Sequence, residues 1–372
     1  MLRVLHYIPG FLYGGIESMF LSWYKNIDFA KIQFELLLRT QDDSATALCE
    51  YRDLGGVYYR LAPISIKGIG KFRKSVDDFF RKHHNYDILH AHEADPFVLE
   101  TAKKYGIKKI VLHSHSTSCG NSLKEKIRFY DEKISMRFYV DYAFACSKLA
   151  AEWKFGGLKF KKNDVTIVHN AIMTEKYDFS EYTREQIRKK MSLKNNFVLG
   201  HVGRMCIQKN QSFLIDVLVE CLKKHENTIL MMIGDGPDAE VLKAYAEKKK
   251  VEKQILFLGV RNDVNQLLQG MDCFLLSSMY EGLPVTLIEA QAAGLPCVIS
   301  NSITNETEIT DAIYRLSIEE SPLYWAEKIE QIRKNFVRKS TREQITRSGF
   351  DVSHEVVSLV NKYHEIAEVE EK

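Results

Sequence analysis

The chain has 372 residues, of which 45% are hydrophobic and 27% are charged, as is typical of a soluble globular protein with room for two domains. A formal net charge of only +3 gives no general reason to expect a nucleic-acid partner. The seven cysteines form no CxxC pair, the N-terminus has no signal-peptide layout, and no apolar run reaches about 18 residues. We therefore expect a cytoplasmic protein with free thiols and no membrane span.

Short apolar runs alternate with helical patterns in the first half of the chain. The expected strands are 2–8, 34–40, 87–92, 109–115, 141–147 and 165–172. The expected helices are 14–27, one that ends at Gly55, 96–106, which ends at Gly106, and one through Trp153. A polar and charged stretch, SEYTREQIRKKMSLKNN, follows and is interpreted as a connector.

A second alternating series begins at residue 197. The expected strands are 197–203, 228–234, 255–260 and 273–278, and the expected helices are 210–225, 239–250, 264–271 and about 284–293. Apolar strands joined by helices indicate parallel sheets, so the fold class is α/β with two Rossmann-like domains facing a cleft. We predict a first domain over 1–178, a connector over 179–196, a second domain over 197–345 and a C-terminal segment over 346–372.

Basic residues cluster between positions 67 and 82, interleaved with four apolar residues. The basic residues are Lys67, Lys71, Arg73, Lys74, Arg81 and Lys82. One interpretation is the solvated face of an amphipathic helix. The alternative is a surface that rests on anionic lipid.

Two glycine-containing loops follow strands and precede helices. The first holds Gly14 and Gly15, but its spacing is not GxGxxG, and an ordinary tight turn explains it equally well. The second, Gly234 to Ala239, has the letters GxGxxA of a dinucleotide fingerprint. Because Pro237 removes an N–H from the helix start, and no acidic residue ends the next strand, we interpret it as a structural turn.

Two histidine pairs end neighbouring predicted strands. His90 and His92 form one HxH pair, and His113 and His115 form the other. Alternation in a strand puts each pair on one face, in an arrangement that metal sites use. A metal-dependent hydrolase is therefore one alternative, although HExxH is absent. Histidines at the carboxyl ends of parallel strands also line ligand crevices without any metal.

Two loops of the second series carry charged residues beside helix starts. Arg204 and Lys209 precede a helix, where cations are disfavoured by the helix dipole unless an anion binds, so the pair suits a diphosphate. Glu281 and Glu289, eight positions apart, flank the start of an apolar helix at Gly282 and Leu283. The N–H groups there form an anion site. A carboxylate on such an apolar helix needs partners, and ligand hydroxyls would serve.

Taken together, these motifs resemble the retaining glycosyltransferases of the GT-B fold, family GT4. EGLPVTLIE is similar to the E-x7-E motif of that family, GRMCIQKN to its GR…KN segment, IGDGP to its GxGP turn and GGIE to its N-terminal glycine loop. The resemblance extends from Gly14 to Glu289. The stretches ACSKLAAEWKFGG, VHNAI and EAQAAGLPCVIS further resemble bacterial capsular and exopolysaccharide glycosyltransferases.

The resemblance implies a role for each matching residue. Glu289 would bind ribose hydroxyls, Glu281 the donor sugar, and the backbone of Gly282 and Leu283 the phosphates. Arg204 and Lys209 would neutralise the leaving diphosphate, and His115, or its rival His113, would lie near the reacting sugar. The remaining implied donor contacts are Gly14, Gly15 and Val260. The last helix would cross back onto the first domain. The stretch NSITNETEITDAIYRLS departs from the family because it lacks the common glycine-rich segment.

The implied reaction moves a sugar from a nucleoside diphosphate to an acceptor hydroxyl with retention. No DxD motif and no convincing nucleophile occur, so we expect neither a metal nor another cofactor, and a front-face route without a glycosyl-enzyme. UDP is the expected nucleotide. A sugar or lipid-linked oligosaccharide is the expected acceptor, with possible peripheral contact at the inner face of the cell membrane. The alternatives are the hydrolase, a non-catalytic nucleotide-sugar-binding protein and, most weakly supported, a nicotinamide oxidoreductase.

Overall fold

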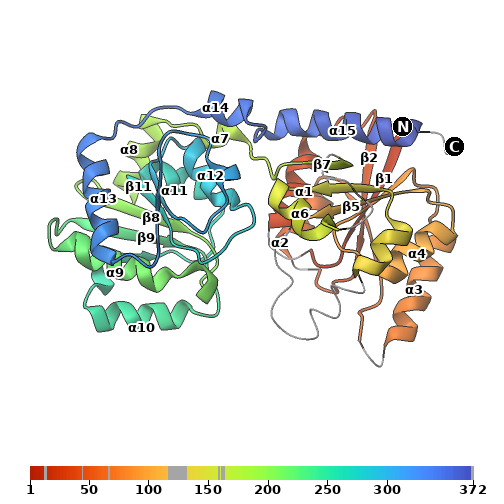
Figure 1. Cartoon of the computed structure of the whole chain (residues 1–372), viewed down its shortest axis with the longest axis horizontal. Helices are drawn as coiled ribbons and strands as arrows, with labels where there is room; N and C mark the ends of the chain where they lie inside the picture. The colour runs from red at the N-terminus through yellow and green to blue at the C-terminus, as the bar shows by residue number, and fades with distance from the viewer. Residues whose placement is uncertain are drawn as a thin grey trace. The chain divides into compact units, whose positions relative to one another are not determined.

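The computed structural model describes residues 1–11, 15–43, 45–65, 68–115, 132–157, 160 and 164–369. The chain forms two compact units, Met1–Ala171 with Val352–Lys372, and Ile172–Asp351 (Figure 1). The sequence placed these boundaries after residues 178 and 345. The short helix α7 (Thr174–Tyr177) instead belongs to the second unit, because the Gln269 side chain donates to the Tyr177 carbonyl at 2.9 Å.

The first unit is a parallel sheet of seven strands in the order β3-β2-β1-β4-β5-β6-β7. The strands are β1 (Leu2–Ile8), β2 (Ile32–Leu38), β3 (Val57–Arg60), β4 (Ile88–Ala91), β5 (Lys109–Ser114), β6 (Tyr142–Ala145) and β7 (Val165–Ile167). The described helices include α1 (Gly15–Asn26), α2 (Thr46–Asp53), α3 (Ile69–Lys82), α4 (Pro96–Lys104), α6 (Lys148–Phe155) and the C-terminal α15 (Val352–Glu368).

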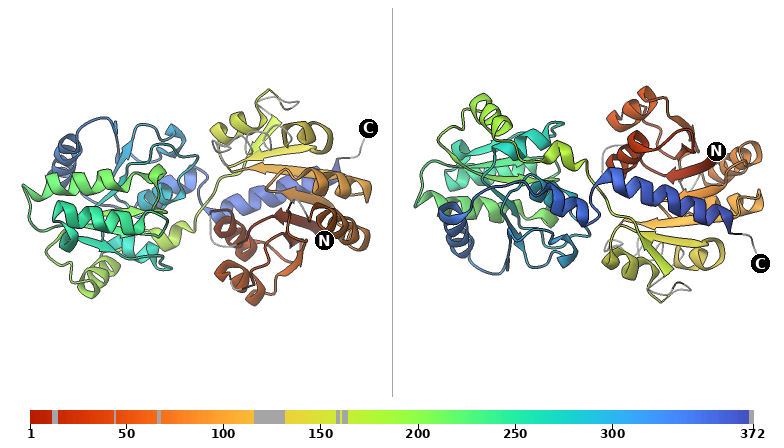
Figure 2. Two further views of the ribbon diagram at one scale, coloured as in Figure 1. Left: turned by 90° about the horizontal axis from the view of Figure 1, so that it is seen from below. Right: turned by 90° about the horizontal axis from the view of Figure 1, so that it is seen from above.

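Helix α15 returns to the first unit, as the fold class predicted (Figure 2). It packs beside α1, and its Tyr363 is fully buried in the core. The Tyr363 ring stacks on Phe144, and its hydroxyl lies 2.5 Å from Nδ1 of His90 in β4. The last helix is therefore part of the first hydrophobic core.

The second unit is a parallel sheet of six strands in the order β10-β9-β8-β11-β12-β13. The strands are β8 (Phe197–Val202), β9 (Thr228–Ile233), β10 (Ile255–Phe257), β11 (Cys273–Leu276), β12 (Cys297–Ser300) and β13 (Ile313–Leu316). The larger helices are α9 (Gln211–Leu222), α10 (Ala239–Lys249), α11 (Val264–Gly270), α12 (Val285–Ala292) and α13 (Pro322–Asn335), and α14 (Arg342–Arg347) follows. The strand order reverses between β8 and β11, which is where open α/β sheets bind ligands.

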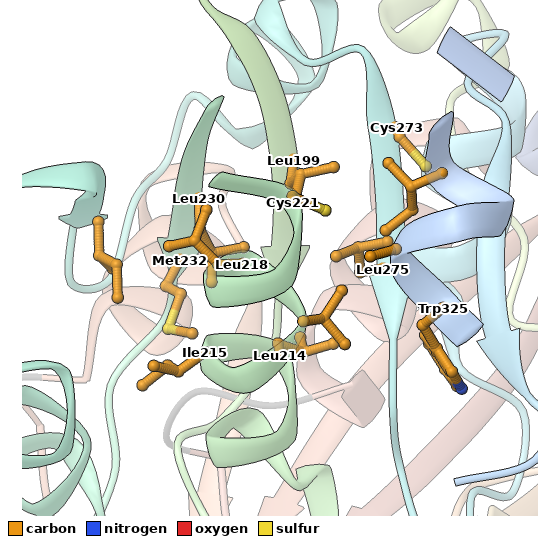
Figure 3. Packing of buried hydrophobic residues seen from close by; sticks show 14 of the residues in the cluster. Leu199, Leu214, Ile215, Leu218, Cys221, Leu230, Met232, Cys273, Leu275 and Trp325 are labelled. Atoms are coloured by element: carbon orange, nitrogen blue, oxygen red, sulfur yellow. The ribbon is translucent and has the colours of Figure 1, made fainter. Parts of the chain in front are cut away.

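Apolar layers cover both faces of the second sheet. On one face, Leu214 and Leu218 of α9 and Trp325 of α13 pack against Leu199 and Leu275 (Figure 3). On the other face, α11 and α12 contribute a second buried cluster. Burial on both faces explains why the strands are continuous apolar runs.

The predicted connector is in fact largely helical. Residues Glu181–Lys190 form α8, whose only buried side chain is Ile187. Arg184 and Arg188 of α8 both bind the Asp272 carboxylate, and Arg188 does so at 3.1 Å. These ion pairs hold α8 on the second unit. Because α8 has so few apolar residues, its sequence shows no helical hydrophobic period, and the helix was not predicted.

The basic stretch forms α3, and its four apolar residues face the core. Phe72, Val76, Phe79 and Phe80 are buried, so the solvated-face interpretation accounts for the pattern. Lys67 lies outside the described residues. Within the part of the chain that the structure describes, no helix is long and apolar enough to cross a membrane. Lipid contact by α3 remains a prediction that rests on its charge alone.

Candidate functional site

The loops after β8 and β11 are tied together by hydrogen bonds at the carboxyl edge of the second sheet. The Met279 amide donates to the Gln208 carbonyl at 2.8 Å, and the Gln208 side chain donates to the Tyr280 carbonyl at 2.9 Å. The Ser277 hydroxyl donates to the Lys209 carbonyl at 3.1 Å. Two predicted segments that are about 70 positions apart thus form one rigid surface.

Lys209 and Glu281 bind each other across these two loops. The Lys209 ammonium donates to Oε1 of Glu281, and the Ser278 hydroxyl donates to the same oxygen at 2.6 Å. The side chains are only 16% and 9% exposed, so the pair is held in a largely dry environment. Among the described residues Oε2 has no hydrogen-bond donor, which leaves it open to a ligand hydroxyl.

Helix α12 begins immediately after this pair. Pro284 precedes the first helical residue, and no side chain caps the helix start. Gly282 is half-buried and Leu283 is 8% exposed. Because the first amides of a helix have no partner within the helix, the start of α12 can receive an anion.

Glu289 lies about one turn into α12 and is the second carboxylate of the predicted pair. The Tyr177 hydroxyl donates to its Oε1 at 2.6 Å. Burial raises the pKa of Glu289 to about 7, although the Tyr177 bond acts in the opposite direction. At neutral pH the carboxyl group is therefore close to half ionised. The sequence-based interpretation treated Glu289 as an ionised carboxylate that accepts hydrogen bonds.

Arg204 is exposed, and the described residues offer its guanidinium no hydrogen bond or ion pair. Its backbone, in contrast, is fixed, because Gln211 donates to the Arg204 carbonyl at 2.8 Å. His201 lies within 3.3 Å of the same Gln211 amide and 3.0 Å from the Leu275 carbonyl. Burial lowers the pKa of His201 to about 4, so it is a neutral structural bridge. The sequence analysis missed His201 and Gln211. The signal that could have identified them is a polar residue at the end of a strand followed by another at the start of the next helix.

The GxGxxA turn has a structural explanation. A Cβ at Gly234 would lie 2.1 Å from the Gly203 carbonyl oxygen, and one at Gly236 would lie 2.2 Å from the Met205 carbonyl oxygen. Both glycines thus let the turn approach the loop that carries Arg204. Val260, the remaining predicted contact in this unit, follows β10 and is 61% exposed.

The segment after β12 that departs from the family pattern is bound by one side chain of α12. The Gln291 carbonyl oxygen accepts from the Ile309 and Thr310 amides, both at 3.1 Å. Its amide nitrogen donates to the Thr307 carbonyl at 2.8 Å. Gln291 therefore fixes the segment that replaces the common glycine-rich one.

Five histidines cluster at the carboxyl edge of the first sheet. His92 lies 3.2 Å from His6 and 2.8 Å from His115, and His90 lies 3.2 Å from His113. The rings within each HxH pair lie close together, as alternation along a strand predicted, and the two pairs are also in contact with each other. His6 of β1 was missed, although it occupies the strand next to β4.

Burial is the main reason that all five imidazoles are neutral. It lowers the pKa of His6 and His115 to about 3, and it also lowers the pKa of His90, His92 and His113. His113 is 1% exposed and His115 is half-buried. Exposure therefore favours His115 over His113 as the residue that could contact a ligand.

The predicted N-terminal glycine loop is described only in part. Gly15 is the exposed first residue of α1, and a Cβ added there would meet nothing within 4 Å. Packing within the first unit therefore does not require a glycine at this position. Gly14 lies outside the described residues.

Comparison with known proteins relates the chain to glycosyltransferases. Residues 183–350 match the family described as Glycosyl transferases group 1. EpsF of Bacillus subtilis (strain 168), named as a glycosyltransferase, is 28% identical over 370 residues, covering 97% of this chain and 96% of that protein. An Escherichia coli UDP-Gal:alpha-D-GlcNAc-diphosphoundecaprenol alpha-1,3-galactosyltransferase is 27% identical over 292 residues, covering 72% and 74%.

A solved structure with the same fold covers both units. Anabaena Alr3699/HepE in complex with UDP-glucose has a TM-score of 0.76 at 17% identity, covering 98% of this chain and 99% of that one. Two parallel-sheet units, with a helix returning to the first, define the GT-B fold. The chain thus has the fold of the GT-B glycosyltransferases, and the segment that matches the group 1 family lies in its second unit.

Proposed function

We propose that this enzyme transfers a sugar from a nucleoside diphosphate sugar, with UDP as the nucleotide, to an acceptor hydroxyl with retention of anomeric configuration. The bond between Lys209 and Glu281 carries the proposal. This bond joins the loop of Lys209, which the resemblance assigns to the diphosphate, to the loop of Glu281, which it assigns to the donor sugar. The Escherichia coli relative and the Anabaena structure, named for UDP-Gal and UDP-glucose, support UDP.

The donor would lie along the start of α12. Its ribose hydroxyls would donate to Glu289, its phosphates would accept from the Gly282 and Leu283 amides, and its sugar hydroxyls would donate to Oε2 of Glu281. Because the Lys209 ammonium is paired with the Glu281 carboxylate, Arg204 would supply the unpaired cation for the diphosphate.

The chemical step exchanges one bond at the anomeric carbon for another. The bond from that carbon to the phosphate oxygen breaks, and a bond to the acceptor oxygen forms on the same face. The acceptor proton moves to the leaving phosphate oxygen, which yields the nucleoside diphosphate. Arg204, Lys209 and the helix start would stabilise the charge that develops on that phosphate.

The acceptor would be a sugar or a lipid-linked oligosaccharide used to build a bacterial surface polysaccharide. The diphosphoundecaprenol in the name of the Escherichia coli relative supports a lipid-linked acceptor. The exposed basic residues of α3 would then approach anionic lipid. Binding to liposomes that contain anionic lipid should weaken as salt is raised. Equal binding to neutral liposomes would show that the basic residues of α3 do not recognise anionic lipid and form only a solvated helix face.

A thermal-shift screen with UDP-, GDP- and ADP-sugars tests the donor assignment. A UDP-sugar should stabilise the wild-type chain, and Glu289→Ala should remove that shift. Turnover with the stabilising donor and an acceptor panel should release UDP and give a product with the donor's anomeric configuration. Inversion would refute retention, and binding without turnover across the panel would indicate a non-catalytic nucleotide-sugar-binding protein.

A further inference from the structure

We propose that His92, His113 and His115 form a binding site for a divalent transition-metal ion of the zinc class. One ring nitrogen from each residue lies within 4.8 Å of the others. Zinc bound to nitrogen at about 2.0–2.1 Å in a tetrahedral site needs ligand nitrogens about 3.4 Å apart. A small closing movement of the three rings would meet that requirement.

Two of the three residues have a nitrogen with no partner. Nε2 of His113 and Nδ1 of His115 are buried and accept or donate no hydrogen bond within the described chain. A buried polar atom without a partner is costly, and a bound ion would satisfy those that carry the lone pair. Three neutral imidazoles would leave a fourth position for water or a small anion.

A second triad, His6, His90 and His92, has similar spacing. Both triads need His92, and a neutral imidazole has one lone pair, so one triad would bind at a time. His90 and His92 each have both nitrogens engaged, so within the described chain only His6 of this second triad has a nitrogen without a partner, against two residues of the first triad. His6 and His90 are also fully buried, whereas His115 is half-buried at the strand end and gives an ion a path of entry. The outer triad is therefore the one that we assign.

The glycosyltransferase expectation from the sequence included no metal, whereas the hydrolase alternative used the two HxH pairs as ligands. The present proposal concerns metal binding alone and assigns no hydrolytic reaction to the site. The assignment requires only that three imidazoles bind one ion, so metal binding can be measured without a glycosyl acceptor.

The test is a titration of the chelator-treated full chain with Co²⁺, which reports ligand type optically. We expect one Co²⁺ per chain with a tetrahedral spectrum and no thiolate charge-transfer band. His115→Gln should weaken binding by at least about tenfold, since even changes to outer partners of metal ligands cost that much. His84→Gln alters an exposed histidine outside the cluster and should bind like wild type.

The result that would overturn the site is absence of binding, or a thiolate band, which would assign the ion to the cysteines. A larger loss in His6→Gln than in His115→Gln would also overturn it, in favour of the inner triad. Circular dichroism without metal establishes that each variant folds. If His115→Gln does not fold, His113→Gln takes its place, because it removes another ligand of the assigned triad and leaves His6, His90 and His92 unchanged.

Discussion

At the scale of single residues, substitution of Arg204 should affect catalysis and leave folding stability nearly unchanged. Its guanidinium is exposed and has no partner in the described chain, so Arg204→Ala should change the free energy of unfolding by no more than about 0.5 kcal/mol. Loss of a cation at the leaving phosphate should lower kcat about 10²–10³-fold, as removal of an oxyanion-stabilising donor does. Denaturant unfolding and initial rates measure the two effects.

The matched control is Arg347→Ala, which removes another exposed arginine, one that forms an ion pair with Glu343 on the same helix. It should leave both quantities unchanged. Wild-type activity in Arg204→Ala would refute the diphosphate contact. Equal losses in both variants would point to a general effect of charge.

Glu289 should make donor binding depend on pH. The pKa of Glu289 is about 7, so lowering the pH below 7 protonates a carboxylate that must accept from ribose hydroxyls. The Kd for the donor should therefore rise as pH falls, approaching about tenfold per pH unit if only the ionised form binds. Calorimetric titration between pH 5.5 and 8 would follow this change, because the two ends of this pH range lie roughly one to two units from the pKa of Glu289.

Glu289→Gln is the control because its side chain accepts but cannot ionise. Any other group that titrates in this range acts in both experiments, and its effect cancels when the two Kd values are compared. A ratio that does not vary with pH would show that ionisation of Glu289 does not govern donor binding in this range.

At the scale of elements, the glycine turn after β9 sets the position of the loop that carries Arg204. Gly236→Ala would place a Cβ 2.2 Å from the Met205 carbonyl oxygen, which is backbone and cannot swing away. We expect a loss of about 1–3 kcal/mol in unfolding free energy, as for other overpacked sites, together with reduced transfer. Denaturant unfolding and initial rates would measure these losses.

Gly15→Ala is the matched comparison, because its Cβ meets nothing within 4 Å. Its unfolding free energy should equal that of wild type. A fall in transfer in this variant would then identify a ligand that approaches Gly15. Full stability of Gly236→Ala would contradict the packing explanation of the turn.

The elements that the sequence predicted are those with a local period. Helix α12 begins within one residue of its predicted start, because Pro284 and Gly294 mark its ends. Helix α8 was missed because its contacts are ion pairs with Asp272, about 85 positions away. The bond from Tyr177 to Glu289 spans 112 positions and has no local signal. The sequence therefore indicated which residues to inspect, and tertiary contacts determined their partners and charge.

At the scale of the whole molecule, the chain leaves the first unit after Ala171 and returns at Val352. Two neighbouring contacts join these crossing segments. Ile172 donates to the Phe350 carbonyl at 2.9 Å, and the His169 amide donates to Oε1 of Glu355 at 2.7 Å. Glu355 thus helps to fix the start of α15 beside the segment that leaves the first unit.

Glu355 should make the stability of this arrangement fall as pH rises. Burial raises its pKa from 4.5 to about 7, so the folded chain holds a proton that the unfolded chain releases between these values. The contribution of Glu355 is complete below about pH 4.5 and is lost as the pH rises through 7. A shift of this size corresponds to on the order of 3 kcal/mol.

Glu355→Gln keeps the acceptor for the His169 amide and removes the ionisation. Relative to wild type, its unfolding free energy should therefore increase from pH 5 to pH 8, by up to about 3 kcal/mol. Denaturant unfolding of both chains at the two pH values measures this difference, in which the titration of every other group cancels. An equal difference at both pH values would show that the carboxyl group is ionised in the folded chain, and that α15 is held without a buried proton.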